Sequence, residues 1–527
     1  MTTLGKSGKL TTGTLVVGCF AVMVAQIGLA IPATLNGLFQ QDLHPIGSQL
    51  TWISDAFLLP VAVLELTFGV LGDLFGRKRL MLVGGGLLTA GELVSATSTG
   101  VYLLWVGQAL AGLGAAALFP TSLSMIAAGT EHQHRDRARA IAIWAGFLST
   151  GGFVAPLLGG ITATYGSWRS SFVVVAILAV LTAVISALFA KDSSAPEGRS
   201  LDWGGQITLA IGLFALLVGV IEGPTDGWAS ATVVFAFIIA VVGLVLFVAV
   251  ERRTRSPLLR LELFRNRQFA IASIVAVVGM FSFLGTAYAT SIRLGPIQEQ
   301  APLRTGVAFV LLQGPALVLI PLTSWLLDRV NPRWLLGAGF AIMGAGQLYA
   351  ATLPISDGTL TALIVPLGLV GIGFAFAVCS ITATAVNTVP AHFTGMASAT
   401  TSLLRDFGFT LGPALVGAIA LGRAAIGLGS ALPGSGLPAA QIAAAQQVAA
   451  EGGPLAVNGL PPGAPGSAAH DLAFNALGHG YSIGYLVCGI CALVAAVLAI
   501  LVLHGAPAVS TVKDEGSDER PVTGAVG

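Results

Sequence analysis

Charged residues are scarce in this chain. Asp, Glu, Lys and Arg make up 9% of its 527 residues, whereas hydrophobic residues make up 55%. A soluble protein carries about 25% charged residues, so this composition excludes a soluble globular protein and predicts an integral membrane protein. The net charge of +1 gives no support to nucleic-acid binding. No Gly-rich loop precedes a Lys-Ser or Lys-Thr pair in phosphate-binding spacing, which argues against ATP as the direct energy source.

Cysteine is also rare. All four cysteines lie in apolar runs, and the Cys488-x-x-Cys491 pair falls inside the last of these runs. Buried in a membrane helix, such residues are typical packing groups rather than redox or metal ligands. We therefore expect no metal site and no cofactor.

What the chain has instead is fourteen apolar runs, each near the length of about 20 residues that a membrane helix needs. The predicted spans are 13–36, 48–70, 79–97, 101–128, 138–164, 167–190, 203–222, 229–250, 268–293, 304–327, 332–352, 359–388, 393–422 and 480–503. Alternate loops, together with the two tails, hold 20 of the 25 Lys and Arg residues. The positive-inside rule then predicts a multi-pass protein of the cell membrane with both termini in the cytoplasm.

A charged cluster interrupts the apolar runs between the second and third spans, at Gly69-Val-Leu-Gly-Asp73-Leu-Phe-Gly76-Arg77-Lys78-Arg79. Charge is costly in hydrocarbon, so the cluster must lie at a membrane face. A weaker echo, Leu326-Leu-Asp328-Arg-Val-Asn-Pro-Arg, follows the second span of a later block of six. This internal repeat predicts two related six-span halves.

The repeat sets the expected domain organisation: an N-terminal half at 1–190, a linker with two extra spans at 191–267, and a C-terminal half at 268–504. Segment 424–478 is rich in Ala, Gly and Pro, so we expect an external loop, mobile over much of its length, with room for a short helix or hairpin. The tail 505–527 is predicted to be disordered and cytoplasmic.

The charged cluster resembles the loop between helices 2 and 3 of major facilitator superfamily transporters, and other motifs resemble the fourteen-span drug/proton antiporters of that superfamily. These are Trp52-Ile-Ser-Asp55, the span 5 sequence Gly151-Gly-Phe-Val-Ala-Pro156-Leu-Leu-Gly159-Gly160, and Arg405-Asp406-Phe-Gly-Phe-Thr-Leu-Gly412. The resemblance implies two six-helix bundles plus two extra helices. It also implies export of lipophilic or cationic drugs, not an enzyme activity, with the proton gradient as energy source.

Two positions depart from the family pattern. Met23 stands where the first span of the family carries an aspartate, and Gln108 stands where the fourth carries an arginine. In the family both groups are tied to proton coupling. An alternative is therefore a weakly coupled or uncoupled transporter of neutral or lipid-like molecules, and a further one is a transport-inactive membrane sensor.

Five ionisable residues fall within the predicted spans, where such residues usually face a cavity or a partner. Asp55, Glu65 and Asp406 are the candidate substrate and proton groups, with Asp55 and Asp406 bordering one central cavity. Arg405 lies next to Asp406 but about 100° away on the helix, so each is expected to need a partner elsewhere. Glu92 is expected to be solvated or structural. Gln108 and the aromatic Trp52, a possible cation–π partner, complete the candidate substrate set.

The charged cluster has a different expected role. Gly69, Asp73, Gly76, Arg77, Lys78 and Arg79, together with Asp328, are interpreted as a conformational latch at the cytoplasmic face, where Asp73 can meet a helix N-terminus. Gly151, Gly159 and Gly160 should let helices approach closely, and Pro156 should kink the fifth span. The expected partners are a small substrate, protons and the lipid bilayer, with the protein as a monomer.

Overall fold

The computed structural model describes residues 11–130, 134–195, 200–254, 257–389 and 394–503. Within these ranges the chain is helical and contains no strand. Fourteen of the helices in these described ranges are long and apolar enough to cross a membrane, which confirms the predicted all-α class and the number of spans. The tail 505–527, predicted to be disordered, lies outside the described residues.

The first six spans form one bundle, the N-half. The Thr11 side chain caps the first span, and the turn between the second and third is made by Gly76, whose φ of 103° favours glycine. The helices of the N-half are α1 (Thr12–Ala30), α3 (Gln49–Phe75), α4 (Arg77–Ala96), α5 (Val101–Ala128), α6 (His134–Tyr165) and α7 (Trp168–Phe189).

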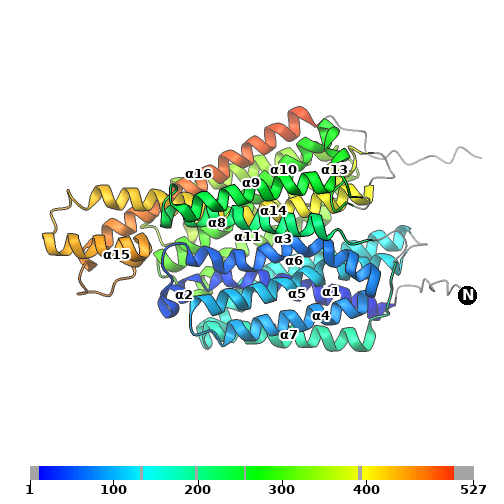
Figure 1. Ribbon diagram of the computed structural model, residues 1–527, viewed down its shortest axis with the longest axis horizontal. Helices are drawn as coiled ribbons and strands as arrows, with labels where there is room; N and C mark the ends of the chain where they lie inside the picture. Colours follow the sequence, from blue (N-terminus) through cyan, green and yellow to red (C-terminus); the bar gives the residue numbers. More distant parts are fainter. Residues whose placement is uncertain (1–10, 131–133, 196–199, 255–256, 390–393, 504–527) are drawn as a thin grey trace, which may run out of the picture.

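The last six spans form the C-half, which lies alongside the N-half (Figure 1). Pro302 and Pro332 stand at the first helical position of two of these spans, where the missing N–H costs nothing. The helices of the C-half are α10 (Arg267–Ile292), α11 (Pro302–Leu327), α12 (Pro332–Thr352), α13 (Leu360–Val386), α14 (Thr394–Ala431) and α16 (His470–Val502). The halves meet where α6 packs on α11 and α14 packs on α3.

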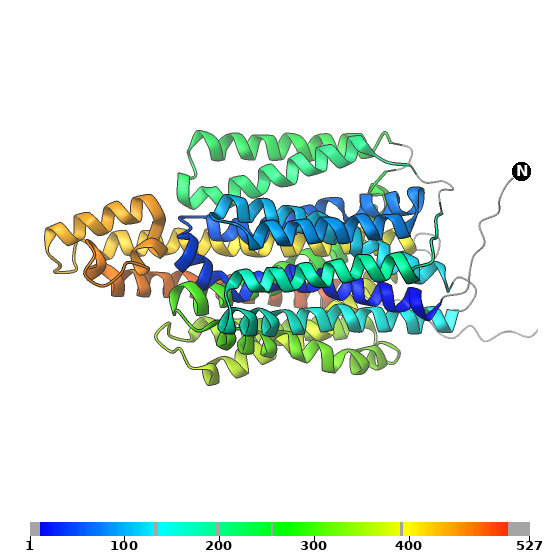
Figure 2. The same cartoon turned by 90° about the horizontal axis from the view of Figure 1, so that it is seen from below.

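The two extra spans are α8 (Trp203–Asp226) and α9 (Ala231–Glu251), which we call the inserted pair. They pack on each other, and α8 also packs on α14 and α3, so the pair covers the seam between the halves. Figure 2 shows the inserted pair along one edge of the bundle. The outer side of α9 leaves Phe235 and Val241 more than half exposed, as expected for a helix that faces lipid.

The segment predicted as an external loop, 424–478, is largely helical instead. The α14 helix continues to Ala431, α15 spans Ala439–Asn458, and α16 begins at His470. Leu428, Leu432, Val457 and other apolar side chains form a small core beneath this hairpin, and that burial stabilises helices that composition alone did not indicate. The hairpin projects beyond the bundle (Figure 1), and we call this end of the molecule the α15 end and the opposite end the Asp73 end.

Two short elements were not predicted. The first span ends in a 3-10 turn, η1 (Ile31–Thr34), and α2 (Asn36–Leu43) follows it before α3 begins. A π-helical turn, η3 (Arg293–Ile297), extends α10 in the same way. Because α2 contacts η3, these two elements bring the N-half and the C-half together at the α15 end.

Candidate functional site

A central cavity lies between the halves. Its wall is mainly apolar and includes helices of both: α1, α3, α5 and α6 from the N-half and α10, α11, α13 and α14 from the C-half. The aromatic lining residues are Phe119, Trp144, Phe283, Tyr288, Phe309, Phe374 and Phe409. An apolar cavity with a few polar groups is typical of a small-molecule site.

The charged side chains of the lining form one cluster, which we call the charged triad. Glu65 comes from α3, whereas Arg405 and Asp406 come from α14. The Arg405 Nε atom lies 3.4 Å from the Asp406 Oδ1 atom, and Glu65 interacts with both residues. Arg405 and Asp406 thus contact each other despite their angular separation on the helix, and Glu65 is the further partner that both were expected to need. With all three groups ionised, the triad has one uncompensated negative charge.

Asp55 does not line the cavity, contrary to its expected position beside Asp406. The cavity-lining residues of α3 are Ser54, Leu58, Val61 and Glu65, which share one helical face. Asp55 is rotated by about 100° from Ser54 and is fully buried near Tyr288 of α10. Within the part of the chain that the structure describes, neither of its carboxyl oxygens has a hydrogen-bond partner.

The other two candidate substrate residues also lie outside the cavity. The Trp52 indole packs against Trp105 and Phe214, with ring centroids 6.0 Å away in both cases. The Trp52 Nε1 atom donates to the Glu222 carboxylate of α8 at 2.6 Å. Gln108 is fully buried within the N-half and donates from Nε2 to Ser95 Oγ at 3.0 Å. Both side chains join helices together in this conformation.

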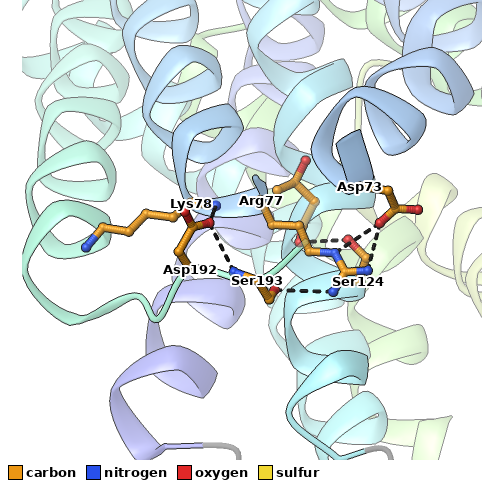
Figure 3. Close-up of polar contacts among 7 residues, drawn as sticks. Asp73, Arg77, Lys78, Ser124, Asp192 and Ser193 are labelled. Carbon is orange, nitrogen blue, oxygen red and sulfur yellow. Dashed lines mark hydrogen bonds and ion pairs between the residues drawn. The ribbon is translucent and has the colours of Figure 1, made fainter. Parts of the chain in front are cut away.

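At the Asp73 end, two of the residues interpreted as a latch, Asp73 and Arg77, are bonded to each other and to the linker. The Arg77 guanidinium donates to Asp73 Oδ1 at 2.7 Å and to Ser193 Oγ at 3.2 Å (Figure 3). Main-chain hydrogen bonds join Arg77 N to Ser193 O and Ala195 N to Asp73 O. Figure 3 also shows Ser124 beside the Asp73–Arg77 pair.

The linker that leads to the inserted pair thus docks on the charged cluster, a contact that the sequence did not indicate. Lys78 reinforces it, because its N–H donates to Asp192 Oδ1 at 3.2 Å and its Nζ atom donates to Ala187 O at 2.7 Å. Arg79 is exposed. Asp328, the counterpart of Asp73 in the second half, is exposed at the end of α11.

The glycines of the fifth span lie at close helix contacts. A Cβ atom on Gly160 would lie 2.9 Å from Leu303 Cα of α11, and one on Gly159 would collide with Thr34 of η1. Pro156 lies within α6, and its carbonyl oxygen is 2.5 Å from where a Gly306 Cβ would be. A Cβ atom on Gly151 would likewise lie too close to the backbone of Met23 in α1.

The contacts of Gly160 and Gly306 join the two halves and close the cavity at the α15 end. There Asn36 donates from Nδ2 to Ser291 Oγ at 2.8 Å, and Gly37 lies against Gly295, so N-half and C-half backbones touch. The cavity extends the other way, to Trp144 and Val378, which lie in the parts of α6 and α13 nearer the Asp73 end. The arrangement is that of a membrane carrier with a site between two bundles, sealed toward one side.

Comparison with known proteins gives the family. Residues 17–413 match the Major Facilitator Superfamily, and the chain belongs to that family of membrane transporters. It is 32% identical to the multidrug resistance protein Stp of Mycobacterium tuberculosis over 70% of this chain and 68% of that protein. It is 27% identical to the tetracenomycin C resistance and export protein of Streptomyces glaucescens, over 94% and 92% of the two chains.

Solved structures agree on the fold. The match to a crystal structure of a peptide transporter spans 92% of this chain and 96% of the transporter chain, with a TM-score of 0.60 at 16% sequence identity. The match to the crystal structure of the nucleoside transporter NupG spans 93% of this chain and 99% of the NupG chain, with a TM-score of 0.62 at 9% sequence identity. At these identities the likeness concerns the fold alone, and it confirms the predicted major facilitator architecture.

Proposed function

We propose that this protein exports lipophilic small molecules, cationic ones among them, in exchange for protons. The observation that carries the proposal is the charged triad in an otherwise apolar cavity, with Glu65 contributed by one half and Asp406 by the other. Relatives that are named for multidrug and antibiotic resistance support drug efflux. Because the cavity is formed by a single chain, a monomer would suffice.

The triad offers a simple means of exchange. Arg405 can compensate only one of the two carboxylates, so the other can accept either a proton or the positive charge of a substrate. Binding of a lipophilic cation and binding of a proton then exclude each other at that carboxylate. The aromatic wall contributes apolar contact and cation–π attraction, which are not specific for one compound.

The direction of transport follows from the predicted topology. If the positive-inside rule holds, the α15 end is external and the cavity of this conformation is closed to the outside. Movement of one half against the other would then open the α15 end and release substrate there. Protons would enter from that side and return to the cytoplasm as the carrier resets.

Transport of ethidium, a lipophilic cation, into inverted membrane vesicles tests the proposal. Imposing a pH gradient should drive accumulation of ethidium, and an ionophore that collapses the gradient should abolish it. Uptake that is indifferent to the gradient would favour the uncoupled carrier of neutral or lipid-like molecules. That candidate rests on Met23, which packs against Gly151, and on Gln108, which binds Ser95, because both positions are uncharged.

A further inference from the structure

Glu92 occupies a buried position that the central cavity does not reach. The residue lies near the end of α4, and its relative exposure is 0%. Gly28 of α1 covers it so closely that a Cβ atom there would lie 2.9 Å from Glu92 Oε1, with Leu88 and Phe57 beside the same point. Among the described residues, neither carboxyl oxygen of Glu92 has a hydrogen-bond partner. Of the two expected roles of Glu92, solvated or structural, the burial excludes the solvated one.

Among the residues that the structure describes, no cation pairs with this carboxyl group. The helices that pack on α4 are α1, α3, α5 and α7, and α1 and α5 contain no Asp, Glu, Lys, Arg or His. The charged residue of α7, Arg169, is bonded to Asp42 at 2.7 Å and to Ser98 O at 3.1 Å. The acidic residue of α3 that lies at a similar depth in the bundle is Asp55, which also has no hydrogen-bond partner within the described part of the chain.

The remaining titratable groups on these helices are remote or differently engaged. Cys19 lies nine residues before Gly28 on α1, which is about 13 Å along the helix. Tyr102 of α5 is 66% exposed. Gln108, which does not titrate, donates to Ser95, and the described residues hold no hydrogen bond between its amide and Glu92. An ionised carboxylate in such a place would be far more costly than the neutral acid, so Glu92 must hold a proton while α1 covers it.

We propose that Glu92 is a proton-binding site separate from the substrate cavity and coupled to it through α1. Gln26, Leu29 and Ala30 of α1 line the cavity, whereas Gly28 faces Glu92. Substrate and proton therefore act on opposite faces of one helix. Three residues after Gly28, α1 gives way to η1, which contains Pro32 and interrupts the regular helix.

The coupling follows from a difference between two states. With α1 against α4, as here, only the protonated form of Glu92 is accommodated. If α1 moves away from Glu92 when the halves rearrange, water can reach the carboxyl group and the proton can leave. Proton binding then favours the covered state, and the free energy available is the difference in proton affinity between the two states.

This inference rests on the proposed proton-coupled export and is tested on the full-length protein. Glu92→Gln keeps the shape and removes the ionisation, whereas Glu92→Asp keeps the carboxyl group. Glu262→Gln, at an exposed carboxylate in η2 (Leu261–Arg265), is the matched control. We expect E92Q to lower ethidium accumulation driven by a pH gradient by about tenfold or more. Ethidium binding and gradient-independent ethidium exchange should change by less than about twofold, and E92D should recover coupling in part.

Infrared spectroscopy of the purified protein gives a second measurement that does not require transport. The parent should show an absorption of a protonated carboxyl group that is absent from E92Q and that is lost on alkaline titration. If gradient-driven transport in E92Q equals that of the parent, or if the two spectra do not differ, the proposal is overturned. A parent protein that ignores the gradient would refute coupled export instead, and the infrared comparison would still decide whether Glu92 binds a proton.

Discussion

The Trp52 indole of α3 donates a 2.6 Å hydrogen bond to the Glu222 carboxylate of α8. The other oxygen of Glu222 accepts from Ser48 Oγ at 2.7 Å. Nearer the Asp73 end, the Gln206 side chain of α8 donates to Val63 O of α3 at 2.9 Å. These polar bonds join the inserted pair to the N-half, whereas the contacts of α8 with Ala414 and Ala418 of α14 are apolar. The inserted pair should therefore move with the N-half.

Removing the Glu222 carboxylate should loosen that attachment. Glu222→Leu leaves the Trp52 and Ser48 donors without their acceptor, and we expect it to cost about 1–3 kcal/mol of stability. Thermal unfolding of the purified protein measures the loss. Glu222→Gln, which keeps one acceptor oxygen, should lie between the parent and E222L. Equal melting temperatures for all three would show that the bonds contribute nothing.

Neutralising Asp406 should discriminate between substrates. In Asp406→Asn the carboxylate that pairs with Arg405 is lost, so the charged triad no longer has an excess negative charge for a cation. We expect export of cationic compounds to fall by about tenfold more than export of neutral ones. Minimum inhibitory concentrations, together with vesicle transport of matched compounds, measure this. Asp357→Asn, in the loop between α12 and α13 and outside the cavity lining, is the control. Equal effects on both classes would remove Asp406 from the substrate site.

The charged cluster at the Asp73 end should affect turnover rather than affinity. Asp73→Asn removes the ionised acceptor of a 2.7 Å ion pair with Arg77, far from the cavity lining. We expect slower transport with ethidium affinity within about twofold of the parent, because the change biases conformations and does not touch the ligand. Equilibrium binding and initial rates give the two quantities. The exposed counterpart Asp328 provides the comparison, since Asp328→Asn should have the smaller effect. A large loss of affinity without a conformational shift would contradict this expectation.

The sequence was sufficient for the architecture because lipid demands long apolar helices, and these leave an unmistakable pattern. It was insufficient where an element depends on tertiary contact. The Ala/Gly-rich α15 is stabilised by the small core at Leu428, Leu432 and Val457, and α2 by contacts with η3, neither of which has a local signal.

For the site, the sequence identified which residues are ionisable within the spans but not which way they face. Glu65 and Asp55 both stand in α3, and only the helical register relative to the cavity separates them. The sequence contained that register, since Ser54, Leu58, Val61 and Glu65 follow a helical stripe, yet nothing marked this stripe as the one toward the other half. The burial of Glu92 was missed for the same reason.

The ion pair between Asp42 and Arg169 at the α15 end should make the stability of the protein depend on pH. Asp42 accepts hydrogen bonds from Arg169 at 2.7 Å and from Trp168 at 2.8 Å, and these hold the pKa of the Asp42 carboxyl below its ordinary value. A lowered pKa means that the stabilisation is present at neutral pH and is lost as the pH falls through the folded-state pKa. Because the pair is partly exposed, Asp42→Asn should cost less than about 1 kcal/mol at pH 7. The difference in melting temperature from the parent should shrink as the pH falls and vanish once the pH is below the folded-state pKa of Asp42. A difference that persists in acid would mean that the charge is not its cause.

Closure at the α15 end should depend on the small size of Gly160. A side chain at this position of α6 would run into the backbone of α11, because even a Cβ atom would lie 2.9 Å from Leu303 Cα. We therefore expect Gly160→Leu to shift the population toward a state that is open at the α15 end. A cysteine introduced at Asn36, which is 1% exposed here, should react faster with a water-soluble maleimide in that variant.

Gly146 provides the matched control, since it lies on the same helix and a Cβ atom there has no neighbour within 4 Å. Gly146→Leu should leave the labelling rate of the Asn36 cysteine unchanged. The four natural cysteines are replaced in all variants so that the maleimide reports one site. Accumulation of ethidium should fall in G160L, because a carrier held open at one end cannot complete the cycle, whereas G146L should transport normally. If G160L folds and its labelling rate equals that of G146L, the close approach of α6 and α11 does not control closure.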